Sequence, residues 1–274
     1  MLTNSTPLRG ASINLILCAT ANYLQHLAHP SNEVLEIVAA ESLGEGWREK
    51  NAFVVGTAWT AQHELMSQTY SGRFVYLSVL VLLIQFMYAL CSFIAELFPE
   101  GEKFASRVYS AAALVNGLAI VTGILFTVIA IIHEYHTVYR QQWDFFETTY
   151  DDTYLLGYRV RWYALLMYAV HLPLLLAPYI DMTTKRPHLL RHATPSSLAT
   201  ATALTFVNVG YHAWLRHNYV MNDGAIPYPW YYDIKDSLVT LGVYLLCVNG
   251  VIGGVAIAIG NKLKKIRDHT MKGE

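Results

Sequence analysis

Long apolar runs, separated by shorter polar segments, dominate the pattern of residues along this chain. A helix that crosses the hydrocarbon core of a bilayer, about 30 Å thick, needs about 20 mostly apolar residues. Five runs reach that length, and a sixth is weaker because it contains amides and a histidine that packing inside a bundle could satisfy. The five are Phe74–Phe98, Val108–His133, Trp162–Met182, Leu198–Val220 and Leu238–Gly260, and the weaker one is Ala11–Ala28.

Composition agrees with this pattern. Of 274 residues, 54% are hydrophobic and only 14% are charged, whereas soluble domains average about 25% charged residues. We therefore predict an all-α protein, a polytopic transmembrane helix bundle of about six spans. Residues 1–274 form one domain, with a long loop at 30–72 and a basic C-terminal tail at 261–274. The net charge of -1 gives no reason to expect nucleic acid as a partner.

Charge outside the runs predicts the orientation of the bundle. With six spans both termini lie on one side, and the basic stretches KLKKIRDHTMK and TTKRPHLLRH face that same side. Because Lys and Arg are enriched in cytoplasmic loops, the termini are predicted to be cytosolic. We expect an integral multi-pass protein of an endomembrane. The three cysteines lie inside predicted spans and are interpreted as small apolar packing residues; they are Cys18, Cys91 and Cys247.

His171 is the clearest candidate for chemistry, because it lies near the middle of the span Trp162–Met182. An ionisable side chain at that depth is by default a candidate functional residue. Pro173 and Pro178 follow it, and each removes a backbone donor, so the span is expected to kink and to admit water near His171. A neutral histidine that joins two helices by hydrogen bonds is the alternative. Asp181 lies about 15 Å further along the helix and is expected to mark the membrane interface or to bind a neighbouring loop.

Other histidines of the chain are candidate metal or haem ligands. In HEYH, His133 and His136 are three residues apart rather than the four of a zinc-protease helix, and an interfacial role at the end of a span is favoured. His212 and His217 could pair with His171 across a haem. However, histidine pairs at bis-haem spacing do not recur on two helices, so core histidines are favoured. We predict no metal and no cofactor.

Several short motifs occur in a characteristic order over the last three quarters of the chain. GRFVYLSVLVLLIQ leads into the second predicted span, with Ser78 after an Arg-aromatic-x-Tyr run, and AVH ends at the mid-membrane His171. Five further elements follow: the acid Asp181, RPH at Arg186–His188, PS at Pro195–Ser196, DGAIPYP at Asp223–Pro229 and IGNKLKK at 259–265. Together these motifs resemble the family of the androgen-induced protein and the androgen-dependent TFPI-regulating protein.

The resemblance implies an integral-membrane hydrolase that splits fatty-acid esters of hydroxy fatty acids with a threonine and a histidine on different spans. Carried over to this chain, Ser78 is the nucleophile and His171 the general base. Serine has the same attacking oxygen as threonine and is less crowded. The substrate would be a lipid ester that enters sideways from the bilayer. Asn116 and Asn208 are candidates for stabilising the oxyanion, or simply for hydrogen bonds between helices.

Three positions depart from the family pattern: serine replaces threonine at 78, Met167-Tyr168 replaces Asn-His, and Ile226 replaces a tryptophan. The serine, together with the long loop at 30–72, fits a second hypothesis, a non-catalytic membrane subunit or scaffold of a larger complex. A transporter in which His171 relays protons ranks third, because no pair of short, broken spans recurs in corresponding halves of the chain.

Overall fold

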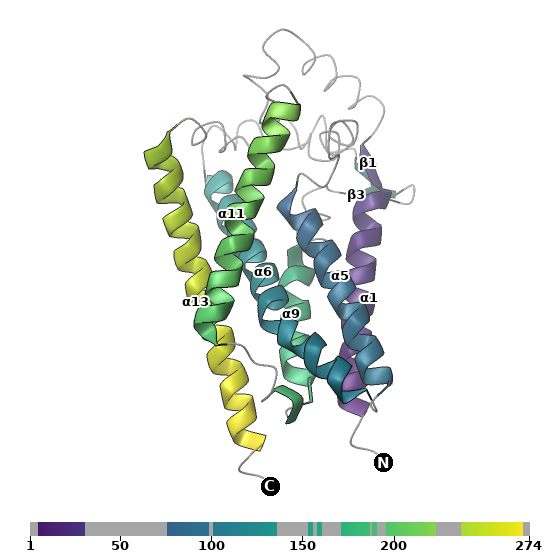
Figure 1. Ribbon diagram of the computed structural model, residues 1–274. Coiled ribbons are helices and arrows are strands. Elements are labelled where there is room, and N and C mark those ends of the chain that lie inside the picture. Colours follow the sequence, from purple (N-terminus) through teal and green to yellow (C-terminus); the bar gives the residue numbers. More distant parts are fainter. Residues whose placement is uncertain are drawn as a thin grey trace.

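The computed structural model describes residues 5–30, 76–98, 101–135, 153–155, 158–160, 171–186, 188–190, 196–222 and 237–270. Long helices stand side by side and form a bundle, with the start of α1 and the end of α13 at the same end (Figure 1). This confirms the helical class. The helices are α1 (Ser5–Leu27), α5 (Leu77–Leu97), α6 (Glu102–Tyr135), α9 (Leu172–Thr184), α11 (Ser197–Met221) and α13 (Leu238–Thr270).

A small antiparallel sheet, which the sequence pattern did not predict, lies at the other end of the bundle (Figure 1). Its strands are β1 (Ala28–Pro30), β2 (Thr153–Leu155) and β3 (Tyr158–Val160), in the order β1-β2-β3. Tyr154 is opposite His29 on one side and Arg159 on the other. The sheet therefore connects the end of α1 to residues more than 120 positions later.

Three of the described helices are long and apolar enough to cross a membrane, over Leu77–Leu97, Glu102–Leu125 and Leu238–Ile266. This supports a membrane protein but is fewer than the six spans predicted. α1 and α11 contain more polar residues, and α9 has only 13 residues, about 20 Å. The predicted loop at 30–72 and the first half of the fourth predicted span, residues 162–170, lie outside the described residues. The predicted basic tail is helical as far as Thr270, where α13 ends.

Local sequence signals explain where several helices begin. α11 follows Ser196, whose hydroxyl accepts a hydrogen bond from the amide of Ala199 at 3.1 Å, as a good N-cap does. α13 follows Ser237, which accepts from the amide of Thr240 at 3.2 Å. Pro173 lies in the first described turn of α9, at a position where a missing amide hydrogen is tolerated. The residues that precede His171 lie outside the described ranges, so the predicted kink stays a prediction.

Four of the helices form a ring. α1 and α6 each pack against both α5 and α9, while α5 and α9 have little backbone contact with one another and so lie diagonally across the ring. α6 also packs against α11 and α13 on its outer side. Gly123 lets α9 come close to α6, since a Cβ atom there would lie 2.7 Å from a methyl of Leu175. Side chains from α5 and α9 therefore meet in the interior of the ring.

The interior face of α5 is unusually polar. Its buried residues include Gln85, Tyr88 and Ser92, which repeat at intervals of three and four residues, and the half-buried Ser78 lies on the same stripe seven residues before Gln85. Residues at this spacing share one face of a helix. In an ordinary amphipathic helix the interior face is apolar. In α5 this face carries hydroxyl and amide groups into the bundle.

Candidate functional site

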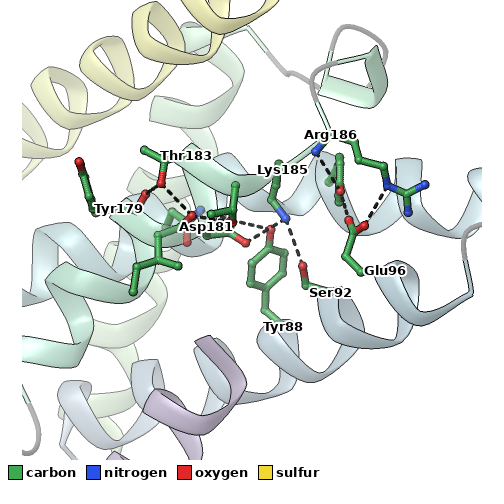
Figure 2. A network of polar contacts seen from close by, with 12 residues as sticks. Tyr88, Ser92, Glu96, Tyr179, Asp181, Thr183, Lys185 and Arg186 are labelled. Atoms are coloured by element: carbon green, nitrogen blue, oxygen red, sulfur yellow. Dashed lines mark hydrogen bonds and ion pairs between the residues drawn. The ribbon is translucent and has the colours of Figure 1, made fainter. Parts of the chain in front are cut away.

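Asp181, in the last turn of α9, is the centre of a buried polar network (Figure 2). It is only 3% exposed. Its Oδ2 accepts hydrogen bonds from the hydroxyl of Tyr88 at 3.0 Å and from Nδ2 of Asn116 at 2.8 Å. The ammonium of Lys185, one turn later, lies 2.9 Å from Oδ1. Asp181 therefore binds side chains of α5 and α6 inside the bundle, so the predicted contact with a neighbouring loop is wrong. That Asp181 marks the membrane interface stays a prediction.

A second ion pair continues the network towards the end where the termini lie. Nε of Arg186 is 2.9 Å from Oε2 of Glu96, and a terminal nitrogen of the guanidinium donates to the carbonyl of Ala95 at 2.9 Å. The hydroxyl of Tyr109 donates to the other oxygen of Glu96 and accepts from the backbone amide of Arg186 at 3.3 Å. Figure 2 shows Arg186 and Glu96 facing one another from different elements. The segment that follows α9 is thus fixed to both α5 and α6.

Lys185 joins the two halves of the network. Its ammonium donates to the hydroxyl of Ser92 at 3.3 Å and lies 4.1 Å from the ring centroid of Tyr109. Two acids, Asp181 and Glu96, compensate two bases, Lys185 and Arg186. Buried charges are tolerated only when they are paired and hydrogen-bonded, as here. The two bases, counted as loop charges in predicting the orientation, are therefore buried inside the protein.

The two predicted catalytic residues lie at the starts of α5 and α9, the helices that the Tyr88–Asp181 hydrogen bond joins. Ser78 is half-buried in the first turn of α5, and His171 is 4% exposed and directly precedes α9. Both helices run antiparallel to α6. The end of α5 lies next to the start of α6, because the amide of Gly101 donates to the carbonyl of Phe98 at 3.0 Å. For α9, Asp181 lies beside Asn116 while Leu175 lies beside Gly123.

Counting residues along the helices from this hydrogen bond gives Ser78 and His171 about the same depth in the bundle. Ser78 is ten residues before Tyr88, and His171 is ten residues before Asp181. At about 1.5 Å per residue both lie about 15 Å from the hydrogen bond, in the same direction. Ten residues make about 2.8 turns, so the spacing sets the depth of the side chains and not the direction in which they point. Contact between the hydroxyl and the imidazole stays a prediction.

The other histidines considered as ligands lie among aromatic rings. His212 is buried on α11, with its ring edge-on to Tyr244 of α13 at 5.2 Å between centroids. His217 is stacked on Trp214 at 5.9 Å. Within the described ranges, no group of three His, Cys, Asp or Glu side chains could hold a metal ion. Of the HEYH stretch, His136 lies outside the described residues.

The two amides considered for the oxyanion both join helices. Asn116 donates to Asp181, and Nδ2 of Asn208 on α11 donates to Oδ1 of Asn249 on α13 at 3.3 Å. Their hydrogen bonds fit the simpler of the two predicted roles. Sequence reasoning missed the network itself, although Asp181 and Lys185 have the i, i+4 spacing of a helical ion pair.

No family model, no curated protein and no solved structure matches this chain.

Proposed function

We propose that this protein is an integral-membrane lipid ester hydrolase in which Ser78 is the nucleophile and His171 is the general base. The observation that carries the proposal is the common depth of the two residues on diagonal helices of one ring. The motif order around Ser78 and His171 supports it independently. His171 is only 4% exposed, so its imidazole lies inside the bundle of apolar helices.

The chemistry requires only these two side chains, a stabilised oxyanion and water. Ser78 Oγ attacks the ester carbonyl carbon while His171 accepts its proton, and the alcohol leaves with that proton. Water then attacks the acyl group on Ser78 and gives a proton to His171. The fatty acid is released and the serine recovers its proton from His171. The net reaction is ester plus water to acid plus alcohol.

The network would act as a positioning device for this pair. Tyr88 and Asp181 are on the same helices as Ser78 and His171, so their hydrogen bond sets the relative height of α5 and α9. A nucleophile and its base must come within about 3 Å, and a shift of about 1 Å is costly. In this proposal the ion pairs do not react. They prevent α9 from sliding along the ring.

The substrate would be a lipid ester with long chains that enters from the bilayer. Large apolar side chains on the outer faces of α5 and α9 are exposed and suit contact with lipid; they include Leu83, Ile84, Met87, Leu172 and Leu176. The proposal keeps six spans, with the basic end of α13 and both termini on the cytosolic side of an endomembrane.

A fluorophosphonate probe tests the proposal on full-length protein in detergent. We expect covalent labelling of Ser78 that disappears in Ser78→Ala and falls at least tenfold in His171→Ala. Matched controls are Ser110→Ala, on the exposed face of α6, and His217→Ala, exposed on α11. Ser78→Thr, which restores the family's residue, should keep ester hydrolysis. Labelling that is unchanged in His171→Ala would overturn the assignment of the base.

One observation favours the second candidate, a non-catalytic membrane subunit or scaffold. All four charges of the network are paired, which is the arrangement expected of a region that holds a structure together. Folded protein that is never labelled at Ser78 and hydrolyses no ester would place this candidate first.

A further inference from the structure

Gln85 is buried in the ring without using its hydrogen-bonding capacity. It is 2% exposed, and in the described structure neither its Nε2 nor its Oε1 has a hydrogen-bond partner. The next polar residues on the same stripe of α5, Tyr88 and Ser92, are both hydrogen-bonded. A buried amide left without partners destabilises the fold, so it needs an explanation.

The position of Gln85 relates it to the proposed nucleophile. It follows Ser78 by seven residues, which is nearly two full turns, so the two share a face of α5 and lie about 10 Å apart along the axis. That face is turned to the interior of the ring, where side chains of α5 and α9 meet. A lipid chain bound with its ester at Ser78 and lying along α5 would pass Gln85.

A second unpaired group lies on the neighbouring helix. Thr122 of α6 is 4% exposed, and its hydroxyl has no partner in the described structure. Tyr88 and Asn116 both contact the Asp181 carboxylate. Gln85 lies three residues before Tyr88, and Thr122 lies six residues after Asn116. Because α5 and α6 are antiparallel, Gln85 and Thr122 lie on the same side of that carboxylate. Their depths therefore differ by about 4.5 Å, on two helices that pack against one another.

We propose that Gln85, together with Thr122, binds a second oxygen-bearing group of the lipid, about 10 Å along the chain from the ester. The group is uncharged and both donates and accepts hydrogen bonds, as a hydroxyl or a protonated carboxyl does, because a carboxamide offers both functions. A plain hydrocarbon chain would leave the amide unpaired, so the site selects oxygenated acyl chains. This assignment rests on the proposed hydrolase and specifies its substrate.

The test uses three esters with the same alcohol and chain length. They carry a methyl, a hydroxyl or a carboxyl group at about 10 Å from the ester carbonyl. Wild-type protein should have a kcat/KM about tenfold higher for at least one oxygenated ester than for the methyl ester, and Gln85→Leu should reduce this ratio to about one. Ile94→Val, exposed on α5, should keep the ratio. Equal rates in wild type, or a ratio that survives Gln85→Leu, would overturn the site.

Binding without turnover separates this proposal from the hydrolase itself. In Ser78→Ala, a hydroxylated fatty acid should raise Tm while the unsubstituted acid of equal length raises it less, and adding Gln85→Leu should remove the difference. Gln85→Leu alone should unfold at a higher temperature than wild type, which shows that the variant folds. If Ser78 is never labelled but this difference is present, the hydrolase fails and the lipid site stands. If both acids act equally, the lipid site fails.

Discussion

Tyr88 and Asp181 form a hydrogen bond of 3.0 Å across the diagonal of a four-helix ring. The same carboxylate oxygen also accepts from Asn116, so one acceptor connects three of the four helices. Ser78 and His171 lie ten residues before Tyr88 and Asp181, so in the proposed hydrolase the network sets the height of the hydroxyl relative to the imidazole.

Tyr88→Phe removes the donor and keeps the ring. Because the acceptor is a buried carboxylate, we expect a loss of about 1.5 to 3 kcal/mol in the free energy of unfolding, measured by denaturation in detergent. A positioning role further predicts a lower kcat for ester hydrolysis with little change in KM, at a temperature where the variant is folded. Tyr179→Phe, on the exposed face of α9, is the control. Unchanged kcat would leave Tyr88 with a structural role only.

Asp181→Asn should be far more damaging, because it leaves the Lys185 ammonium buried without its anion. Breaking a buried pair in this way costs about 3 to 5 kcal/mol. Adding Lys185→Met removes the unpaired charge, so the double variant should be more stable than Asp181→Asn alone. Thermal unfolding of the two single variants and the double variant measures this coupling. Asp268→Asn, exposed near the end of α13, is the matched control. Additive effects would show that the pair is not coupled.

Gly123→Ala tests the close approach of α9 to α6. A Cβ atom would lie 2.7 Å from the Leu175 side chain, so α9 must shift or Leu175 must move. We expect a lower Tm and a lower rate of Ser78 labelling. Gly210→Ala on α11 is the control, since nothing lies within 4 Å of its Cβ position. There alanine should stabilise the helix by about 0.5 to 1 kcal/mol. Equal effects of the two substitutions would contradict the packing described.

The sequence pattern predicted the helices well and their mutual contacts poorly. Apolar length placed a helix at 74–98, where α5 covers Leu77–Leu97, and placed the start of the last helix at Leu238. The strands β1 to β3 were missed because each has three residues and finds its partner by tertiary pairing. The number of spans was predicted from the length and apolar composition of the runs, and three of the described helices are both long and apolar enough to cross a membrane.

The polar network was hidden for a different reason. Asp181, Lys185 and Arg186 look like the charged end of a span, and only the packing of α9 against α5 and α6 turns them inward. The sequence of α5 did contain a signal. Its polar residues Gln85, Tyr88, Ser92 and Glu96 are spaced by three, four and four residues, which indicates a polar stripe on one helix face. Such a stripe in an apolar helix predicts polar partners inside the bundle, although it does not identify them.

The proposed hydrolase depends most on the proximity of the residues at positions 78 and 171, and a thiol at position 78 can test that proximity directly. In protein lacking Cys18, Cys91 and Cys247, Ser78→Cys would introduce one thiol, and an adjacent imidazole would activate it by accepting its proton. We expect the alkylation rate of that thiol at neutral pH to fall at least tenfold when His171→Ala is added, and to stay the same when His212→Ala is added instead. A rate that does not depend on His171 would contradict the hydrolase.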